Sequence, residues 1–357
     1  MEFGSQHVKA MVITAARGVR ISDGGGDVMT CLVTGGAGYI GSHTVADLLD
    51  SGEAVVVVDN LSTGHRQAVP DVPFYLADIG DTAAMVEIMA RHRVDAVIHF
   101  AAHSLVGESV RDPLKYYDNN VGASARLLSA MTRAGVRHIV FSSTAAIFGD
   151  PEHGPIADDH PKEPTNPYGG TKWDIEKMLG WAHRAYGLRS LSLRYFNAAG
   201  AHTARPLGED HHPETHLIPI VLRVALGQRD SVSIFGTDYP TPDGTCIRDY
   251  VHVQDLAAAH RLAVQRLRQG EVTQAAFNLG NGTGFSVQHV VDVARQVTGH
   301  PIPVVMGARR PGDPAQLVAS SERAKRELGW DPQYVDLRDI ITSAWHWHSS
   351  HPQGYAR

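Results

Sequence analysis

The sequence has few of the features that mark secreted, membrane-spanning or nucleic-acid-binding proteins. Among its 357 residues are two cysteines, Cys31 and Cys246, too few for a disulfide framework and typical of a reducing compartment. The longest apolar runs, such as residues 54–58, are far too short to cross a bilayer. The formal net charge of -6 leaves no basic surface for nucleic acid and no polybasic patch for a membrane. These absences predict a cytoplasmic protein that binds neither nucleic acid nor a membrane.

The first informative feature is a glycine-rich turn that follows a strand. Residues 30–34 are β-prone, and Gly35, Gly38 and Gly41 come next in the spacing G-x-x-G-x-x-G, a variant of the dinucleotide-binding fingerprint. Apolar residues at helical spacing follow, so we expect a helix to begin inside the turn. The backbone of such a turn approaches a pyrophosphate closely, and the positive end of the helix stabilises the phosphates. A glycine-rich turn alone is a weak signal.

The next strand strengthens this signal. Residues 54–58 are apolar throughout, as expected for a parallel strand buried on both faces. Asp59 ends the strand, about 20 residues after the turn, where an acid binds the hydroxyls of the adenine ribose. Because its charge would repel a 2′-phosphate, the sequence predicts NAD and not NADP as the cofactor.

The spacing of strands and helices predicts an α/β fold. Strands and helices alternate over residues 29–198, which predicts an NAD-binding domain with a Rossmann-type doubly wound parallel sheet. The pattern is irregular over 199–357, which predicts a smaller mixed α/β substrate-binding domain, with segments near 232–255 and 275–280 returning to the core. Residues 1–28 lack the apolar segment and cleavage site of a secretory signal, so we expect a disordered N-terminal extension.

Tyr168 and Lys172 are the candidate catalytic pair. Asn166 can cap a helix and Pro167 can occupy its first turn, so residues four apart lie on one helix face. An ammonium close to a phenol lowers the phenol pKa, which allows proton exchange with a substrate hydroxyl near neutral pH. Thr144 follows a predicted strand over 136–141, at the sheet edge where ligands gather. Each signal is common by chance, and only their combination with the glycine turn indicates an active site.

Two further sets of polar residues stand out, a pair of arginines and two groups of histidines. Arg248 and Arg310 carry the planar donor fork that suits phosphate, although most surface arginines are only solvated charges. Histidines gather in two places without an H-E-x-x-H motif or a C-x-x-C partner, so we interpret both groups as accidental and predict no metal. These groups are His211, His212 and His216, and His346, His348 and His351.

Together these features resemble the extended short-chain dehydrogenase/reductase family, and within it the members that epimerise UDP-hexoses at C4. The resemblance covers the chain from Met29 nearly to its end. It is carried by long motifs at residues 34–44, 106–110, 116–121, 193–197, 234–240 and 345–347.

The resemblance implies a redox-neutral interconversion of UDP-glucose and UDP-galactose. NAD removes a hydride from the sugar C4, the 4-keto sugar turns about its link to the diphosphate, and the hydride returns to its other face. Tyr168 is then the acid/base on the 4-hydroxyl, Lys172 lowers its pKa and holds the nicotinamide ribose, and Thr144 hydrogen-bonds O4. A homodimer through the helices near 116–134 and 167–186 is also implied.

The resemblance further implies two binding surfaces, with both candidate arginines on the substrate diphosphate. The NAD site would comprise Gly35, Gly38, Tyr39, Ile40, Gly41, Asp59, Asn60, Asp78, Ile79, Phe100, Ala101, Ala102, Ser104, Asn119, Thr144, Tyr168, Lys172 and Phe196. The UDP-sugar site would comprise Asn197, His216, Leu217, Ser233, Phe235, Arg248, Arg310, Asp313 and Leu317.

Three positions depart from the family pattern. Ser104 stands where many members carry a lysine that contacts the NAD phosphates, so we expect weaker retention of the cofactor. His216 replaces an asparagine that contacts the substrate in some members. Leu317 stands where tyrosine often closes the pocket beside the sugar 2-substituent, so we expect the smaller leucine to admit UDP-N-acetylhexosamines.

Other functions on the same fold fit the sequence to different degrees. A nucleotide-sugar 4,6-dehydratase needs an acid pair after the strand-end threonine, where this chain has Ala145 and Ala146. A 4-epimerase of another UDP-sugar, such as a uronate or a pentose, stays open. A non-catalytic NAD-sensing protein also stays open, although such a sensor would be expected to lose Tyr168 or Lys172.

Overall fold

The computed structural model describes residues 11–12, 29–151, 154–310 and 313–356. Its centre is an eight-stranded sheet in the order β1-β4-β3-β2-β5-β6-β7-β12. Seven of these strands are parallel, and β1 joins the edge strand β4 in antiparallel pairing. The strands are β1 (Met11–Val12), β2 (Thr30–Thr34), β3 (Ala54–Asp59), β4 (Phe74–Leu76), β5 (Val94–His99), β6 (His138–Thr144), β7 (Arg189–Tyr195) and β12 (Gln274–Leu279).

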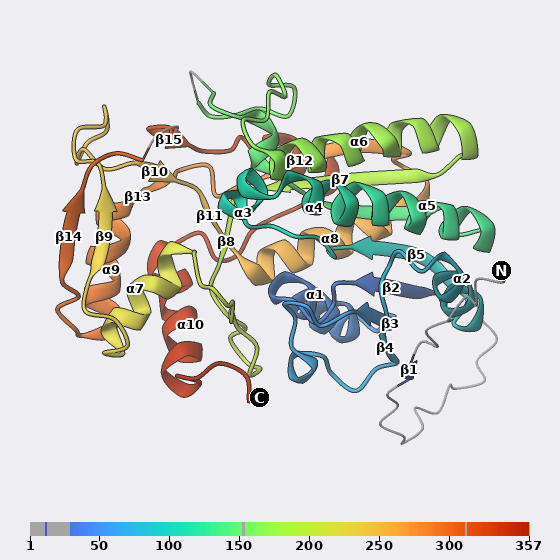
Figure 1. Ribbon diagram of the computed structural model, residues 1–357, viewed down its shortest axis with the longest axis horizontal. Helices are drawn as coiled ribbons and strands as arrows, with labels where there is room; N and C mark the ends of the chain where they lie inside the picture. Colours follow the sequence, from blue (N-terminus) through green and yellow to red (C-terminus); the bar gives the residue numbers. More distant parts are fainter. Residues whose placement is uncertain (1–10, 13–28, 152–153, 311–312, 357) are drawn as a thin grey trace, which may run out of the picture.

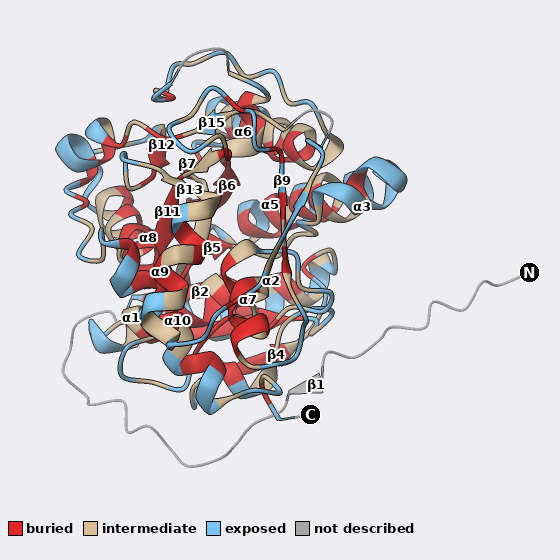
Figure 2. Ribbon diagram, turned by 90° about the vertical axis from the view of Figure 1, so that its left-hand side faces the viewer, coloured by how far each residue is buried: buried red, intermediate tan, exposed pale blue. Residues whose placement is uncertain are grey.

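Helices cover both faces of this sheet (Figure 1). Alternate residues of β2 point to opposite faces, so that Cys31 and Val33 pack with α1 and α8 while Leu32 packs with α2, α5 and α6. The central strands β2, β3, β5 and β6 are buried on both sides, as Figure 2 shows, which explains their largely apolar character. These helices are α1 (Tyr39–Asp50), α2 (Thr82–Arg91), α5 (Ala123–Ala134), α6 (Pro167–Tyr186) and α8 (Val253–Gln269).

A smaller region lies beside the carboxyl ends of the parallel strands, at the left of Figure 1. Three helices, α7 (Leu217–Ala225), α9 (Val287–Thr298) and α10 (Leu337–Ser350), share one apolar core there with the parallel pair β9 (Val232–Phe235) and β14 (Val304–Gly307). The other short strands are β8 (Asn197–Ala199), β10 (Ile247–Arg248), β11 (Tyr250–His252), β13 (Phe285–Ser286) and β15 (Gln316–Leu317). The short helical turns are η1 (Arg66–Ala68), α3 (Val106–Arg111), α4 (Pro113–Tyr116), η2 (Tyr117–Gly122), η3 (Ala145–Phe148) and η4 (Ala324–Leu328).

The predicted α/β fold with a doubly wound parallel sheet is confirmed. Of the predicted extension 1–28, the strand β1 is described, and the rest lies outside the described residues. In the described part of the chain, no helix combines the length and hydrophobicity required to span a membrane.

Two predicted elements differ from the structure. The helix expected over 116–134 is divided into α4, the π-helical η2 and α5. In η2 the buried Asn120 amide donates to the His103 carbonyl and to Thr171, so its polar side chain is satisfied by neighbouring segments and not by water. The strand expected over 136–141 is β6, which begins at His138 because Gly135 ends α5 in the left-handed conformation, and which extends as far as Thr144.

Candidate active site

The glycine turn between β2 and α1 is shaped by close backbone contacts. A Cβ atom at Gly35 would lie 2.6 Å from the Ala101 backbone nitrogen, and one at Gly41 would lie 2.2 Å from the Gly35 carbonyl oxygen. Gly38 is the N-cap of α1 and provides no side-chain hydrogen bond to the first turn. The N-terminal N–H groups of the helix are therefore available to an anion. This turn fits the pyrophosphate of a dinucleotide.

Asp59 fixes the other side of this turn. One carboxylate oxygen accepts a hydrogen bond from the Ala37 backbone at 2.9 Å, and the other accepts from the Leu61 backbone at 2.8 Å. Burial raises the pKa of Asp59, and these two backbone donors oppose that effect. A carboxylate held in this way at the end of β3 suits a ribose diol.

The other residues expected around NAD lie at the same edge of the sheet. Asp78 and Ile79 follow β4, and the segment 100–102 follows β5, with the Phe100 ring 4.6 Å from the ring of His260. Asn119 donates to the Asn120 side chain in η2, and Ser104 is exposed. The structure therefore brings the predicted cofactor residues from β2 to β5 to one edge.

Thr144 ends β6, where its hydroxyl accepts a hydrogen bond from the Ala146 backbone at 3.2 Å. Helix α6 begins as predicted, because the Asn166 side chain caps it by accepting from Gly169 and Pro167 occupies its first turn. The Lys172 ammonium, whose residue is 3% exposed, lies 6.0 Å from the centre of the Tyr168 ring. The structure thus brings the tyrosine, the lysine and the threonine together.

The electrostatics of this group differ from the expectation. The pKa of Tyr168 is raised, because burial disfavours the phenolate more than the Thr144 hydroxyl stabilises it. Burial also lowers the pKa of Lys172 to about 7, an effect that Glu176 opposes. The Lys172 ammonium donates to the Ser142 carbonyl at 2.8 Å, so its nearest polar contact is the backbone and not the phenol. The prediction that Lys172 lowers the tyrosine pKa therefore fails for these side chains by themselves, because desolvation dominates.

A buried ion pair behind the catalytic candidates was missed by the sequence analysis. Arg194 on β7 binds both carboxylate oxygens of Glu176 on α6, at 3.0 and 2.6 Å. The Ser143 hydroxyl donates to the same carboxylate at 2.6 Å. Glu176 lies one helical turn after Lys172, and Arg194 is a charge near the end of a strand that also contains Leu191 and Leu193. These two signals were present in the sequence, but only the fold joins them.

The residues expected around the substrate form one principal group. The Asp313 carboxylate binds Arg248 at 2.7 Å and Arg310 at 2.8 Å, so one acid joins the two arginines. The Arg310 guanidinium lies 5.0 Å from the centre of the exposed Phe235 ring. Strands β10 and β15 pair in register, which places Leu317 beside Arg248.

The remaining predicted substrate residues occupy separate places. The Asn197 side chain on β8 donates to the Asp249 carbonyl, and Ser233 lies on β9. Leu317 and Phe196 both pack against a small apolar cluster of Ile147, Phe148 and Ile156. His216, which precedes Leu217 at the start of α7, binds Glu209 and is not among the contacts of the two arginines.

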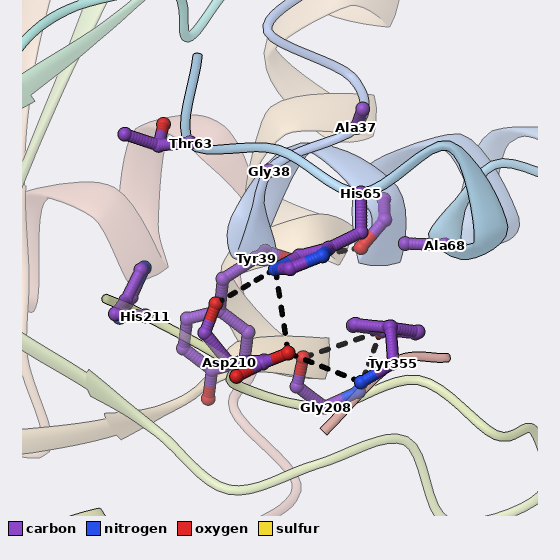
Figure 3. Close-up of a pocket in the computed structure, with 11 residues that line it drawn as sticks. Ala37, Gly38, Tyr39, Thr63, His65, Ala68, Gly208, Asp210, His211 and Tyr355 are labelled. Carbon is purple, nitrogen blue, oxygen red and sulfur yellow. Dashed lines mark hydrogen bonds and ion pairs between the residues drawn. The ribbon is translucent and has the colours of Figure 1, made fainter. Parts of the chain in front are cut away.

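A small pocket lies beside the glycine turn (Figure 3). Its lining includes residues 37–39, Asp210 and Tyr355 of the C-terminal segment. Asp210 accepts from the Tyr355 backbone at 3.1 Å and lies 3.4 Å from the His65 ring. None of the catalytic candidates lines this pocket, so it is distinct from the site around α6.

The parallel sheet, the glycine turn, the strand-end acid and the tyrosine–lysine pair define the class of Rossmann-fold, dinucleotide-dependent enzymes. A sequence model of the NAD dependent epimerase/dehydratase family matches residues 31–280. The chain belongs to this family.

Known relatives match almost the whole chain. A UDP-glucose 4-epimerase from Halalkalibacterium halodurans is 58% identical over 92% of this chain and 98% of its own length. The crystal structure of UDP-glucose 4-epimerase from Brucella ovis in complex with NAD is 49% identical, with a TM-score of 0.87 over 89% of this chain and 98% of that one. The UDP-Glc/GlcNAc 4-epimerase of Campylobacter jejuni is 38% identical, with a TM-score of 0.80 over 90% and 99%. The predictions of the family, the fold class, an epimerase and NAD dependence are confirmed.

Proposed function

We propose that this protein interconverts UDP-glucose and UDP-galactose in an NAD-dependent reaction. The observation that carries the proposal is the meeting of Tyr168, Lys172 and Thr144 at the carboxyl edge of the sheet. The names of the similar proteins support the choice of substrate. The Ala145–Ala146 pair after Thr144 argues against a dehydratase, because it offers no acid to eliminate water.

Tyr168 is the proposed acid/base. Its phenolate form takes the proton of the sugar 4-hydroxyl, and the hydrogen bond from Thr144 favours that form by lowering the pKa of the phenol. The buried Lys172 places a positive charge on the same helix face, 6.0 Å from the ring. Bound NAD, held by the glycine turn and Asp59, supplies the oxidation and reduction at C4 that keep the reaction redox-neutral. Tyr168 then returns the proton to O4 of the opposite configuration.

The arginine pair is the proposed clamp for the diphosphate. Arg248 and Arg310 present donor forks from two segments, and Asp313 holds both. Two cations against one carboxylate leave one positive charge for the phosphates. Anchoring the substrate at its diphosphate leaves the sugar free to turn, which epimerisation at C4 requires.

An assay with UDP-galactose and no added NAD tests this function. We expect UDP-glucose to form, because NAD is regenerated in each turnover and need not leave. Product that forms only with added NAD would support the reaction but would show that the cofactor is not tightly retained. Weak retention of this kind is what the replacement of a lysine by Ser104 predicts. Turnover only with UDP-uronates or UDP-pentoses would assign a different substrate. NAD binding without turnover of any UDP-sugar would favour the sensor alternative.

Leu317 is the proposed determinant of the sugar 2-substituent. It is half-buried against the same small apolar cluster as Phe196, and a tyrosine at this place would fill space that an N-acetyl group needs. We expect the wild type to epimerise UDP-N-acetylglucosamine, and Leu317→Tyr to lower kcat/KM for that substrate by about 10-fold or more. Turnover of UDP-glucose should stay within the same order of magnitude. Leu317→Met, which keeps a flexible side chain, is the control, and a wild type inactive on UDP-N-acetylglucosamine would contradict the assignment.

We also propose a homodimer and a cytoplasmic location. Apolar side chains are exposed on the outer helices around α6, with Val110, Leu114 and Trp181 each more than half exposed. Large apolar side chains exposed in this way are typical of a protein interface. Light scattering should give twice the mass of the chain, and a monomer at micromolar concentration would contradict the dimer. The two cysteines are free and buried, which suits a reducing compartment.

A further inference from the structure

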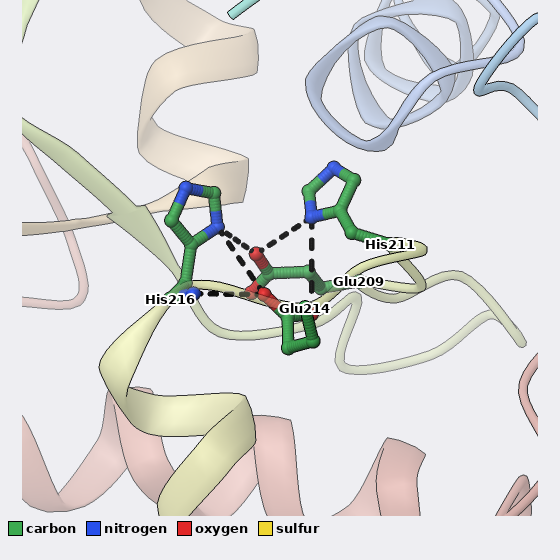
Figure 4. A group of neighbouring side chains, drawn as sticks. All are labelled: Glu209, His211, Glu214 and His216. Carbon is green, nitrogen blue, oxygen red and sulfur yellow. Dashed lines mark hydrogen bonds and ion pairs between the residues drawn. The ribbon is translucent and has the colours of Figure 1, made fainter. Parts of the chain in front are cut away.

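Four acidic and imidazole side chains converge in the loop between β8 and α7 (Figure 4). Glu209, His211, Glu214 and His216 each direct one potential metal-ligand atom to a common point, and these atoms lie within 4.8 Å of one another. The sequence alone suggests that His211 and His216 are accidental neighbours. The structure adds two glutamates that the histidine spacing did not reveal.

The distances are close to those of a metal site. His211 Nδ1 lies 3.2 Å from Glu209 Oε1 and 3.8 Å from Glu214 Oε2, and His216 Nδ1 lies 3.8 Å from Glu214 Oε1. His216 Nδ1 also contacts Glu209 Oε1. Tetrahedral zinc, with bonds of about 2.0–2.2 Å, separates neighbouring ligand atoms by about 3.3–3.6 Å. Small side-chain movements would produce that geometry.

An unpartnered oxygen provides an independent reason to expect a ligand. The Glu214 side chain is 0% exposed, and its Oε2 atom has no hydrogen-bond donor among the described residues. This oxygen faces His211 in the middle of the cluster. A buried carboxylate oxygen without a donor is costly, and a coordinated cation removes that cost.

The charge of the cluster matches a divalent ion. Two buried carboxylates require two positive charges nearby. A divalent cation supplies the same two charges and leaves both imidazoles neutral, as metal ligands must be.

We propose that Glu209, His211, Glu214 and His216 bind one divalent transition-metal ion, for which Zn²⁺ is the best match. Two imidazole nitrogens and two carboxylate oxygens are donors that zinc accepts in four-coordinate sites. The site is structural, since it joins the start of α7 at His216 to the loop that packs against the glycine turn. The contact to that turn is made by His211, whose ring lies 6.1 Å from the Tyr39 ring.

Metal content and binding test the proposal without reference to enzyme activity. The full-length protein is stripped with a chelator and equilibrated by dialysis against Zn²⁺. We expect one ion per chain by elemental analysis, and a higher Tm with zinc than without it. The metal-free wild type should also bind Co²⁺ and then show visible absorption bands as intense as those of four-coordinate Co²⁺ sites. This measurement can be interpreted without any variant.

Variants then locate the ion. Glu214→Gln and His216→Ala should weaken zinc binding by more than about 100-fold, since even the loss of outer-shell partners costs about 10- to 100-fold. His212→Ala is the matched control from the same loop, because His212 pairs with Asp210 outside the cluster, and it should keep wild-type affinity. Circular dichroism establishes that each variant is folded. No zinc above the buffer level, or equal binding by Glu214→Gln, or equal losses in His212→Ala, would overturn the proposal.

Discussion

Replacing Tyr168 with phenylalanine is expected to lower kcat for UDP-galactose by about 10²- to 10⁴-fold, the usual contribution of a positioned acid/base. The phenol oxygen is the only atom removed, so the ring keeps its place near Thr144 at the start of α6. The glycine turn and Asp59 are untouched, and the purified variant should therefore contain as much NAD as the wild type. Turnover and the NAD content of the denatured protein measure the two effects separately.

The control for this change is Tyr186→Phe, which removes a phenol oxygen from the exposed end of the same helix. Its turnover should equal that of the wild type. If Tyr168→Phe kept wild-type kcat, the proton would have to be moved by another group. If Tyr168→Phe lost NAD as well as activity, the result would show that Tyr168 helps to bind the cofactor. Its role as the base would then need independent support.

The local parts of the site could be predicted because each depends on neighbouring residues. The glycine turn, the strand-end acid and the Asn166–Pro167 start of α6 are patterns of a few consecutive residues, and the structure places them as expected. Hydrogen bonds and caps of this kind are decided within one turn or one strand end. The local pattern did not predict that the helix expected over 116–134 is divided at η2. There, Asn120 makes hydrogen bonds to segments distant in the sequence.

The long-range parts could not be predicted from spacing. Arg248 and Asp313 are joined because β10 pairs with β15, a contact between segments far apart in the sequence. The pKa of Tyr168 likewise depends on how deeply the fold buries it, a quantity that the spacing to Lys172 does not contain. Resemblance to known enzymes placed Arg248 and Asp313 in one site, whereas the raised pKa of Tyr168 was accessible only through the structure.

The Arg194–Glu176 ion pair is expected to be the most sensitive charged contact near the site. Arg194 is 4% exposed and Glu176 is 8% exposed, so removing one partner leaves a buried charge without compensation. We expect Glu176→Ala to lower the free energy of unfolding by about 3–5 kcal/mol. The same carboxylate holds Ser143 beside Thr144 and raises the pKa of Lys172, so kcat should fall as well. Urea denaturation followed by circular dichroism, together with turnover at 25 °C, measures both effects.

The matched control is the exposed pair Arg91–Glu87 on α2, which has the same charge types. Glu87→Ala should change the free energy of unfolding by no more than about 0.5 kcal/mol, because exposed helical pairs contribute little. Replacing both partners, as in Glu176→Leu with Arg194→Met, should recover much of the stability, since no buried charge is then left unpaired. Activity should not recover with it, because Ser143 and Lys172 still lack the carboxylate. A double variant that regained both stability and turnover would show that the pair only supports the fold.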